Sequence, residues 1–592
     1  MTVLHFHIDA SEPASRTALV TLELPRQALI RDAVDEAEPE PSSVAELFLA
    51  TWTPGSYLQR EYSRHLSRVT AADADSGEAL PCWKTTKNRF AVELRSHTAR
   101  VRLTYRVYAH ELTVRTADLS DSHAYWNNAC FLLWPVDRPE LPCTLQVNMP
   151  LDWDAASSLE ECDRHAGMIT WRARDLDHAI DSPCLIGKLE QIEFAVNGVP
   201  HAAVLEGLSG IEPPATLAAD LRAIVEAAAA VFGGDLPYPD YRFLCLFTDD
   251  GHGGLEHRTS CTLLAQRTVF SDPKAYRGFL SLCAHELFHA WNVKRLRPAE
   301  LWSYDYEREN LTSFLWLAEG WTAYYDDLLC LRAGHSTAAE YLQQTVTKNI
   351  ERMLSAAGRH KLSLAESSFD AWIRLYRPDE NTRNSSQNYY VNGAVAAMCL
   401  DLMIRSETDG ERSLDDVLRH LFEQTFGAGR GYVLDDVVAA LHEVAGERPV
   451  ALMQSMVQGP LDPPLEALLG GFGIRLEQDR QDKPFLGVTF KPDSTRIATV
   501  QDDTPAARGD MHPDDEILAL RGLRVTSDSW QDVFAAVAHL QEPLEVLVSR
   551  RGVIQTLSVT PTANRSSVVL RIDENCDPGC ERLRRDWLRS SS

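Results

Sequence analysis

The chain has 592 residues, of which 44% are hydrophobic, and a formal net charge of −27 at pH 7. One hydrophobic core does not extend over a chain of this length, so we expect three or four domains. The ordinary apolar content predicts a folded protein rather than a disordered one. The strong negative charge argues against nucleic acid or an anionic membrane as a partner. The sequence does not indicate an oligomeric state.

Residues 1–10 contain no basic start and no long apolar run, so we expect no signal peptide. No segment has the length and apolarity of a membrane span. Several of the twelve cysteines stand alone in apolar segments, which is typical of reduced core residues in a cytoplasmic protein. Cys576 and Cys580 are the one close pair, and their spacing is compatible with a tail disulfide or with free thiols.

Residues 1–190 alternate short β-type runs with turn clusters, as in 17–24 and 99–108. This pattern predicts an N-terminal β-rich domain, built as a sandwich or a saddle-shaped sheet. The segment Thr53-Pro54-Gly55-Ser56-Tyr57 is interpreted as a structural turn.

Residues 191–470 begin with strand signals and one helix at 215–232, and then become helical. The expected helices lie at 275–296, 311–333, 337–357, 388–406, 412–425 and 433–445. We therefore expect an αβ half and a helical half, with a metal site in the cleft between them. The predicted fold class is a multidomain α+β chain.

Residues 480–562 contain Phe485-Leu486-Gly487-Val488 and a second turn signature at 504–509, which together resemble a PDZ domain. The resemblance implies that a peptide ligand adds as a strand near 485–487. Asp510 and Asp514 stand where glycines are common, so a spacer that binds no peptide is the alternative. Residues 563–592 are polar and are expected to form a flexible tail.

The stretch His285-Glu286-Leu287-Phe288-His289 is the most informative motif of the chain. On a helix, positions i and i+4 share a face, so the two imidazoles can hold one Zn²⁺. Glu286 lies one step round the helix, where it can act on metal-bound water as general base. A chance match, with the two histidines at the surface, is the alternative.

A catalytic zinc needs a third protein ligand, and Glu319 is the candidate. It is the one carboxylate in the apolar run 314–325, where burial is costly unless a partner or a cation compensates. The alternative is a buried glutamate bonded to a neighbouring helix end.

The segment Gly253-Gly254-Leu255-Glu256-His257 follows a β-type run. Paired glycines beside a strand let a substrate backbone approach by strand addition. Glu256 would then hold the free α-ammonium of the bound chain. A plain hairpin with an exposed glutamate is the alternative.

Tyr390 opens a strongly apolar helix, where its hydroxyl can stabilise the oxyanion of a tetrahedral intermediate. Packing is the alternative role for such a tyrosine.

Taken together, these residues resemble the gluzincin clan of zinc metallopeptidases. Three segments are similar to the glycyl aminopeptidase family: residues 284–298 around the motif, residues 53–57, and Asp181-Ser182-Pro183. Members of that family often carry a PDZ domain. The resemblance implies a thermolysin-like catalytic domain, with Zn²⁺ as cofactor. It implies these roles: His285, His289 and Glu319 as metal ligands; Glu286 as base; Tyr390 as oxyanion donor; Gly253, Gly254, Glu256 and His257 as substrate-binding residues.

The predicted function is hydrolysis of the N-terminal bond of peptides with a free N-terminus, with a preference for Gly or Ala that the resemblance implies. Two alternatives are an endopeptidase that recruits chains through the PDZ-like block and an inactive binding protein on a peptidase scaffold. Asn292 is a candidate for a residue that hydrogen-bonds to one of the two histidines and orients its ring.

Overall fold

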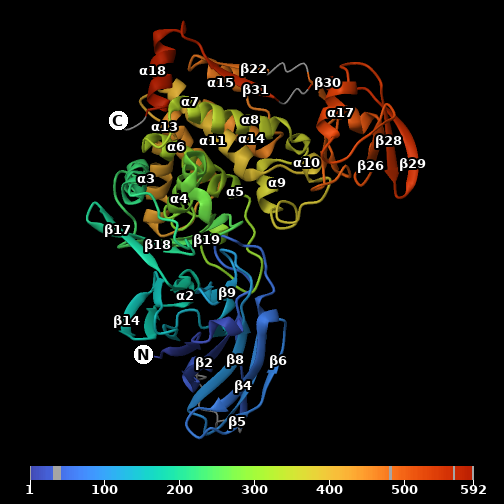
Figure 1. The fold of residues 1–592 in the computed structure, drawn as a ribbon. Helices are drawn as coiled ribbons and strands as arrows, with labels where there is room; N and C mark the ends of the chain where they lie inside the picture. Colours follow the sequence, from blue (N-terminus) through green and yellow to red (C-terminus); the bar gives the residue numbers. More distant parts are fainter. Residues whose placement is uncertain (1, 31–41, 479–482, 564–566, 590–592) are drawn as a thin grey trace. The chain divides into compact units, whose positions relative to one another are not determined.

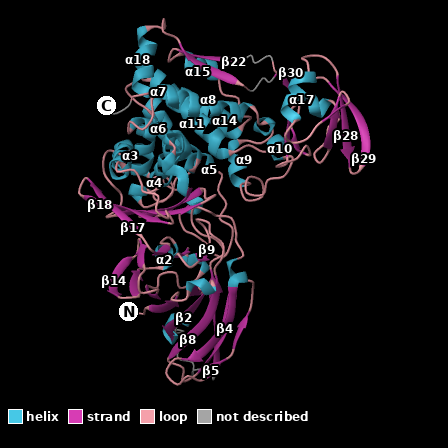
Figure 2. Ribbon diagram, viewed as in Figure 1, coloured by secondary structure: helices cyan, strands magenta, loops and turns pink. Residues whose placement is uncertain are grey.

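The structure is a computed structural model that describes residues 2–30, 42–478, 483–563 and 567–589. The chain forms two compact units, Met1–Leu311 with Phe426–Gly431, and Thr312–Thr425 with Tyr432–Ser592. Figure 1 traces the chain by residue number, and Figure 2 shows its helices and strands.

The first unit begins with an eight-stranded sheet in the order β14-β15-β12-β1-β2-β8-β4-β5. In β2, every second residue is buried, from Ala18 to Leu24, which is the alternation expected of a strand with one face on the core. The strands are β1 (Leu4–Asp9), β2 (Thr17–Pro25), β4 (Leu66–Asp73), β5 (Ala79–Leu80), β8 (Arg100–Tyr108), β12 (Cys143–Asn148), β14 (Glu160–His165) and β15 (Met168–Ala173).

Two four-stranded sheets complete the N-terminal region, in the orders β13-β16-β10-β9 and β11-β3-β7-β6. Their strands are β3 (Ser42–Leu49), β6 (Cys82–Lys84), β7 (Arg89–Arg95), β9 (Ala117–Leu119), β10 (His123–Trp126), β11 (Leu133–Pro135), β13 (Asp154–Ser157) and β16 (Cys184–Gly187). Helix α1 (Arg26–Leu29) lies between β2 and β3, and helix α2 (Leu176–Ile180) lies between β15 and β16. The predicted β-rich N-terminal region is confirmed.

A five-stranded sheet in the order β17-β18-β19-β21-β20 forms the rest of the first unit. Its strands are β17 (Glu190–Val196), β18 (Val199–Glu206), β19 (Tyr241–Thr248), β20 (Gly253–Glu256) and β21 (Ser260–Gln266). Helices α3 (Leu217–Val231) and α4 (Pro273–Phe288) pack against it. Because β20 is the last strand and pairs only with β21 among the described strands, its other edge can accept an extended peptide.

Helix α4 starts and stops for identifiable reasons. The carboxylate of Asp272 accepts hydrogen bonds from the backbone N–H groups of Lys274 and Ala275, and Pro273 occupies the first helical position. The helix ends at Phe288 rather than near residue 296 as predicted. Beyond it the chain turns tightly through Val293, whose φ of 101° is rare for a β-branched residue.

The second unit is built around α11 (Tyr389–Glu407), which is buried along most of its length. Helices α5 (Leu315–Ala318), α6 (Gly320–Arg332), α8 (Thr347–Leu354) and α14 (Glu447–Gln458) pack against it. The remaining helices of this region are α7 (Ala338–Glu340), a π-helical turn (Tyr341–Val346), α9 (Leu364–Phe369), α10 (Thr382–Ser385), α12 (Leu414–Gln424), α13 (Leu434–Ala445) and α15 (Leu465–Gly470). The helical region that the sequence predicts is confirmed, although the helix expected at 311–333 is divided at Glu319.

The segment 484–563 has an apolar cluster of its own, which includes Leu486, Ile497, Ile517 and Val546. Its elements are β23 (Pro484–Phe485), β24 (Val488–Phe490), β25 (Ile497–Val500), α16 (Pro505–Arg508), β26 (Glu516–Leu520), β27 (Leu523–Arg524), α17 (Trp530–Val537), β28 (Leu544–Arg550), β29 (Val553–Val559) and β30 (Thr562–Ala563). A separate core fits a separate domain, and its PDZ type stays a prediction.

The described part of 563–592 is structured, so the prediction of a flexible tail is wrong there. Strand β31 (Val568–Ile572) pairs antiparallel with β22 (Ile474–Gln478), and α18 (Pro578–Trp587) follows. Trp587 is buried and its indole N–H donates to the hydroxyl of Tyr324 at 2.9 Å. One buried indole and alternating apolar residues hold a segment whose polar composition suggested disorder.

All twelve cysteines lie among the described residues and are free thiols, including Cys576 and Cys580. Within the described ranges, the helices are too short or too polar to cross a membrane.

Candidate active site

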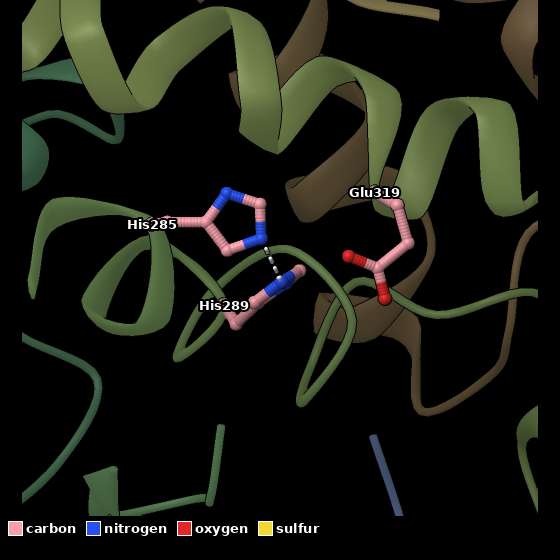
Figure 3. Close-up of side chains that lie close together, drawn as sticks. All are labelled: His285, His289 and Glu319. Atoms are coloured by element: carbon pink, nitrogen blue, oxygen red, sulfur yellow. Dashed lines mark hydrogen bonds between the residues drawn. The ribbon is translucent and has the colours of Figure 1, made fainter. Parts of the chain in front are cut away.

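Helix α4 carries His285 and Glu286 in its last turn, and His289 is its C-cap residue. The Nε2 atoms of the two histidines are 3.2 Å apart. A dashed line marks this contact in Figure 3. Glu286 is 5% exposed, and the hydroxyl of Tyr241 donates to its backbone carbonyl at 3.3 Å. The helix therefore brings both imidazoles to one point, with a buried carboxylate on the adjacent residue.

The turn after α4 fixes the tautomer of His289. Its Nδ1 lies 2.8 Å from the backbone carbonyl of Asn292, which can only accept a hydrogen bond. Nδ1 therefore carries the proton, and in the neutral ring Nε2 holds the lone pair. This orientation is common among metal-bound histidines. The sequence suggested Asn292 as an orienting residue, and the contact is made by its main chain.

Glu319 lies at the junction of α5 and α6 and is 5% exposed. Its carboxylate forms a group with His285 and His289, in which the ligand atoms all lie within 4.8 Å of one another (Figure 3). Two imidazoles and one carboxylate form a donor set that a divalent cation such as zinc accepts. The three predicted ligands are thus close together.

Two glycines let the helices of the second unit approach at Glu319. A Cβ atom on Gly320 would stand 2.6 Å from the Cα atom of Gly393, so neither position has room for a side chain. The same Cβ would lie 2.7 Å from the carbonyl oxygen of Tyr389. The start of α11 therefore packs directly beside Glu319.

Tyr390 lies in the first turn of α11, where Asn388 caps the helix. Burial, followed by the charge of Glu319, raises the pKa of Tyr390 well above its usual value. Its hydroxyl is therefore protonated at neutral pH and able to donate. Tyr376, which sequence reasoning missed because no motif surrounds it, places its hydroxyl 3.3 Å from that of Tyr390.

Gly253 and Gly254 lie on the edge strand β20, and Glu256 ends it. A Cβ atom on Gly254 would stand 2.0 Å from Oε1 of Glu286, so this position accepts no side chain without displacing that carboxylate. Glu256 is 3% exposed rather than a surface residue. Its Oε1 has no hydrogen-bond partner among the described residues.

The sequence indicates only a structural turn at 53–57, and in the structure this turn lies against Glu256. A Cβ atom on Gly55 would stand 2.4 Å from Oε2 of Glu256, and its φ of 91° also favours glycine. Trp52, Tyr57 and Tyr304 pack around the turn in tilted and edge-to-face arrangements, with ring centroids 5.2 to 6.1 Å apart. No sequence signal connected this turn with the Glu256 strand, some 200 residues later in the chain.

Asp181 connects the Glu256 strand to the turn after α4. Its carboxylate accepts from the Lys294 ammonium at 2.8 Å and from the backbone N–H of Arg258 at 2.9 Å, and it lies 3.2 Å from Nδ1 of His257. Burial opposes ionisation, but the charge of Lys294 and these hydrogen bonds lower the pKa of Asp181. Burial in turn lowers the pKa of His257 despite the carboxylate, so the ring is neutral.

Two family models match the chain: the peptidase M61 N-terminal domain over residues 5–188, and M61 glycyl aminopeptidase over residues 278–396. An aminopeptidase N family protein from Idiomarina loihiensis is 29% identical over 99% of this chain and 100% of that chain, with a TM-score of 0.89. The chain therefore has the fold of M61 peptidases. The predicted family resemblance is confirmed to this extent, and both family matches end before the PDZ-like block.

An M1 zinc metallopeptidase from Deinococcus radiodurans is similar at 18% identity, over 78% of this chain and 94% of that chain, with a TM-score of 0.46. Among the curated proteins, none matches the sequence.

Proposed function

We propose that this peptidase is a zinc-dependent aminopeptidase, which removes the N-terminal residue from peptides with a free amino group and prefers Gly or Ala. The observation that carries the proposal is the meeting of three ligand atoms from His285, His289 and Glu319 within 4.8 Å. Glu256 and Glu286 accompany them, and together they supply the groups that aminopeptidase chemistry needs.

His285, His289 and Glu319 would hold the ion. The donor set fits zinc, and the carbonyl that holds Nδ1 of His289 supports the fit because it leaves Nε2 as the ligand atom. When bound there, zinc lowers the pKa of a water towards neutrality and polarises the scissile carbonyl.

Glu286 is the proposed general base. It accepts a proton from the attacking water and then delivers that proton to the leaving amine. Its position beside Gly254 supports this role, since a substrate that extends β20 passes the carboxylate with no side chain between.

Glu256 is the proposed site for the substrate's α-ammonium group. A buried carboxylate with one unpartnered oxygen is well suited to a charged donor that arrives with the substrate. Held there, the amino terminus places the first peptide bond at Glu286, so the enzyme acts on chain ends. Gly253 and His257 flank this contact and would shape the strand that receives the substrate.

Tyr390 is the proposed hydrogen-bond donor to the oxyanion that develops on the scissile carbonyl. Its raised pKa supports the role, because the hydroxyl keeps its proton at neutral pH. Gly55 lies close to Glu256, which leaves little space beside the proposed ammonium site. This closeness supports a preference for substrates whose first residue is small.

The decisive experiment compares the wild type with Glu286→Gln. The variant should bind zinc as the wild type does, measured by metal analysis, while kcat on Gly- and Ala-p-nitroanilides falls by about 100- to 10,000-fold. Chelation of the wild type should abolish turnover and added zinc should restore it. Full activity in the chelated protein would overturn the proposal.

A second comparison separates exopeptidase from endopeptidase. Glu256→Ala should reduce kcat/KM by about 10- to 100-fold on substrates with a free amino group, the value of a charge-assisted hydrogen bond. N-acetylated peptides should be poor substrates for both proteins. Efficient cleavage of acetylated peptides would favour the PDZ-recruited endopeptidase instead.

A further inference from the structure

A second group of metal-ligand atoms lies beside the first. Atoms of Glu256, Glu286 and His289 are all within 4.8 Å of one another, and all three residues are buried. All three belong to the first unit of the chain. The group contains both carboxylates of the proposed mechanism and shares one residue, His289, with the proposed zinc ligands.

His289 cannot serve two ions at once. Its Nδ1 donates to the carbonyl of Asn292, so Nε2 is its single ligand atom. When the ion of the first group occupies that nitrogen, a second cation would depend on Glu256, Glu286 and water. The two positions are therefore unequal, and the second is the weaker.

The charges favour a cation at the second position. Two buried carboxylates at this separation repel each other, and each is poorly solvated. Oε1 of Glu256 is buried and has no hydrogen-bond partner among the described residues. The ammonium of Lys294, a buried cation that interacts electrostatically with Glu256, donates instead to Asp181 at 2.8 Å. A bound cation would satisfy the unpartnered oxygen.

We propose that Glu256 and Glu286 bind a second divalent cation, which occupies the place of the substrate's ammonium group and inhibits the enzyme. The inference rests on the proposed aminopeptidase function and adds a regulation of the same site. The ion would engage the base and the amine-binding residue together, so a bound substrate and a bound second ion exclude each other.

The first test counts ions on the full chain. Metal-free protein is dialysed to equilibrium against rising zinc, and bound zinc is measured by mass spectrometry. The wild type should bind one tight equivalent and then a second, weaker one. Glu256→Gln should keep the tight equivalent and lose the second. Glu206→Gln, which changes another buried glutamate of the first unit, should bind both.

Absence of a second equivalent in the wild type would overturn the proposal, and so would a second equivalent that survives Glu256→Gln. A protein that binds no zinc at any concentration would overturn the proposed function itself. If the wild type binds one tight equivalent of zinc, turns over normally and binds no second equivalent, the second-cation proposal fails and the proposed aminopeptidase function stands.

The second test is kinetic. Zinc above the first equivalent should raise the apparent KM for Ala-p-nitroanilide and leave kcat unchanged, because substrate and ion compete. Added zinc that lowers kcat at saturating substrate, with KM unchanged, would contradict competition for the ammonium site.

Discussion

Gly254 lies directly against the carboxylate of Glu286. A Cβ atom at position 254 would stand 2.0 Å from Oε1 and 2.4 Å from Cδ of that side chain. The edge strand β20 and the helix α4 can approach this closely only because residue 254 has no side chain. The position of the proposed base is therefore set partly by a strand residue that takes no part in proton transfer.

Gly254→Ala should displace Glu286 and lower kcat by about 100-fold, since a shift of about 1 Å in a reacting group has that effect. Zinc content should be unchanged, because the metal ligands are other residues. Gly278→Ala is the control: it lies on the same helix, faces open space and should retain activity. Normal kcat in Gly254→Ala would show that the carboxylate tolerates displacement.

Asp181 should position the amine site without touching substrate. Its carboxylate holds the backbone of Arg258 and the Lys294 ammonium, so Asp181→Asn leaves a buried cation without its counter-charge. Loss of one partner of a buried pair costs about 3–5 kcal/mol. We expect a lower unfolding temperature and a raised KM for substrates with a free amino group.

The double variant Asp181→Asn with Lys294→Met separates these effects. Removal of both charges should recover much of the stability, because no unpaired ion remains. KM should stay raised, since Arg258 still lacks its carboxylate partner. Recovery of KM together with stability would reduce Asp181 to a purely structural residue.

Tyr390→Phe should lower kcat by about 100-fold with little change in KM, as loss of an oxyanion donor does. Tyr376→Phe should cause a smaller fall, because its hydroxyl contacts Tyr390 and not the proposed oxyanion. Steady-state kinetics on Ala-p-nitroanilide measures both. Equal losses in the two variants would indicate that the tyrosine pair acts as packing.

Local patterns predicted the parts of the chain that depend on neighbours in sequence. Alternation in residues 17–24 and helical spacing from 388 to 406 correspond closely to β2 and α11. The spacing of His285 and His289 on one helix face also follows from helix geometry alone. Glu319 became a candidate because a lone carboxylate in an apolar run needs a partner.

Features that depend on distant residues were not predictable. Helix α4 is followed by a tight turn through Val293. No glycine or proline in this turn signals the end of the helix in the sequence. The sequence predicts a turn at Gly55, and only the folded chain places this residue beside Glu256. Trp587 connects α18 to Tyr324, more than 250 residues earlier in the chain, and also packs against Tyr341 and Phe472.

The ion pairs of His123 predict how stability depends on pH. His123 on β10 lies 3.2 Å from Asp118 on β9 and 3.4 Å from Glu206 on β18. Burial opposes protonation, but the two carboxylates raise the pKa of His123 to about 9. An unfolded histidine has a pKa of about 6.5. The stabilisation is therefore complete below about pH 6.5 and is lost as the pH rises towards 9.

The difference in pKa corresponds to about 3 kcal/mol, from 1.36 kcal/mol for each pH unit. His123→Gln should therefore lower the unfolding temperature most at pH 6 and least above pH 9, when thermal unfolding is followed across this range. His97→Gln changes an exposed histidine and should have only a small effect on the unfolding temperature. A difference between wild type and His123→Gln that stays constant from pH 6 to pH 9.5 would show that His123 does not carry this charge in the folded protein.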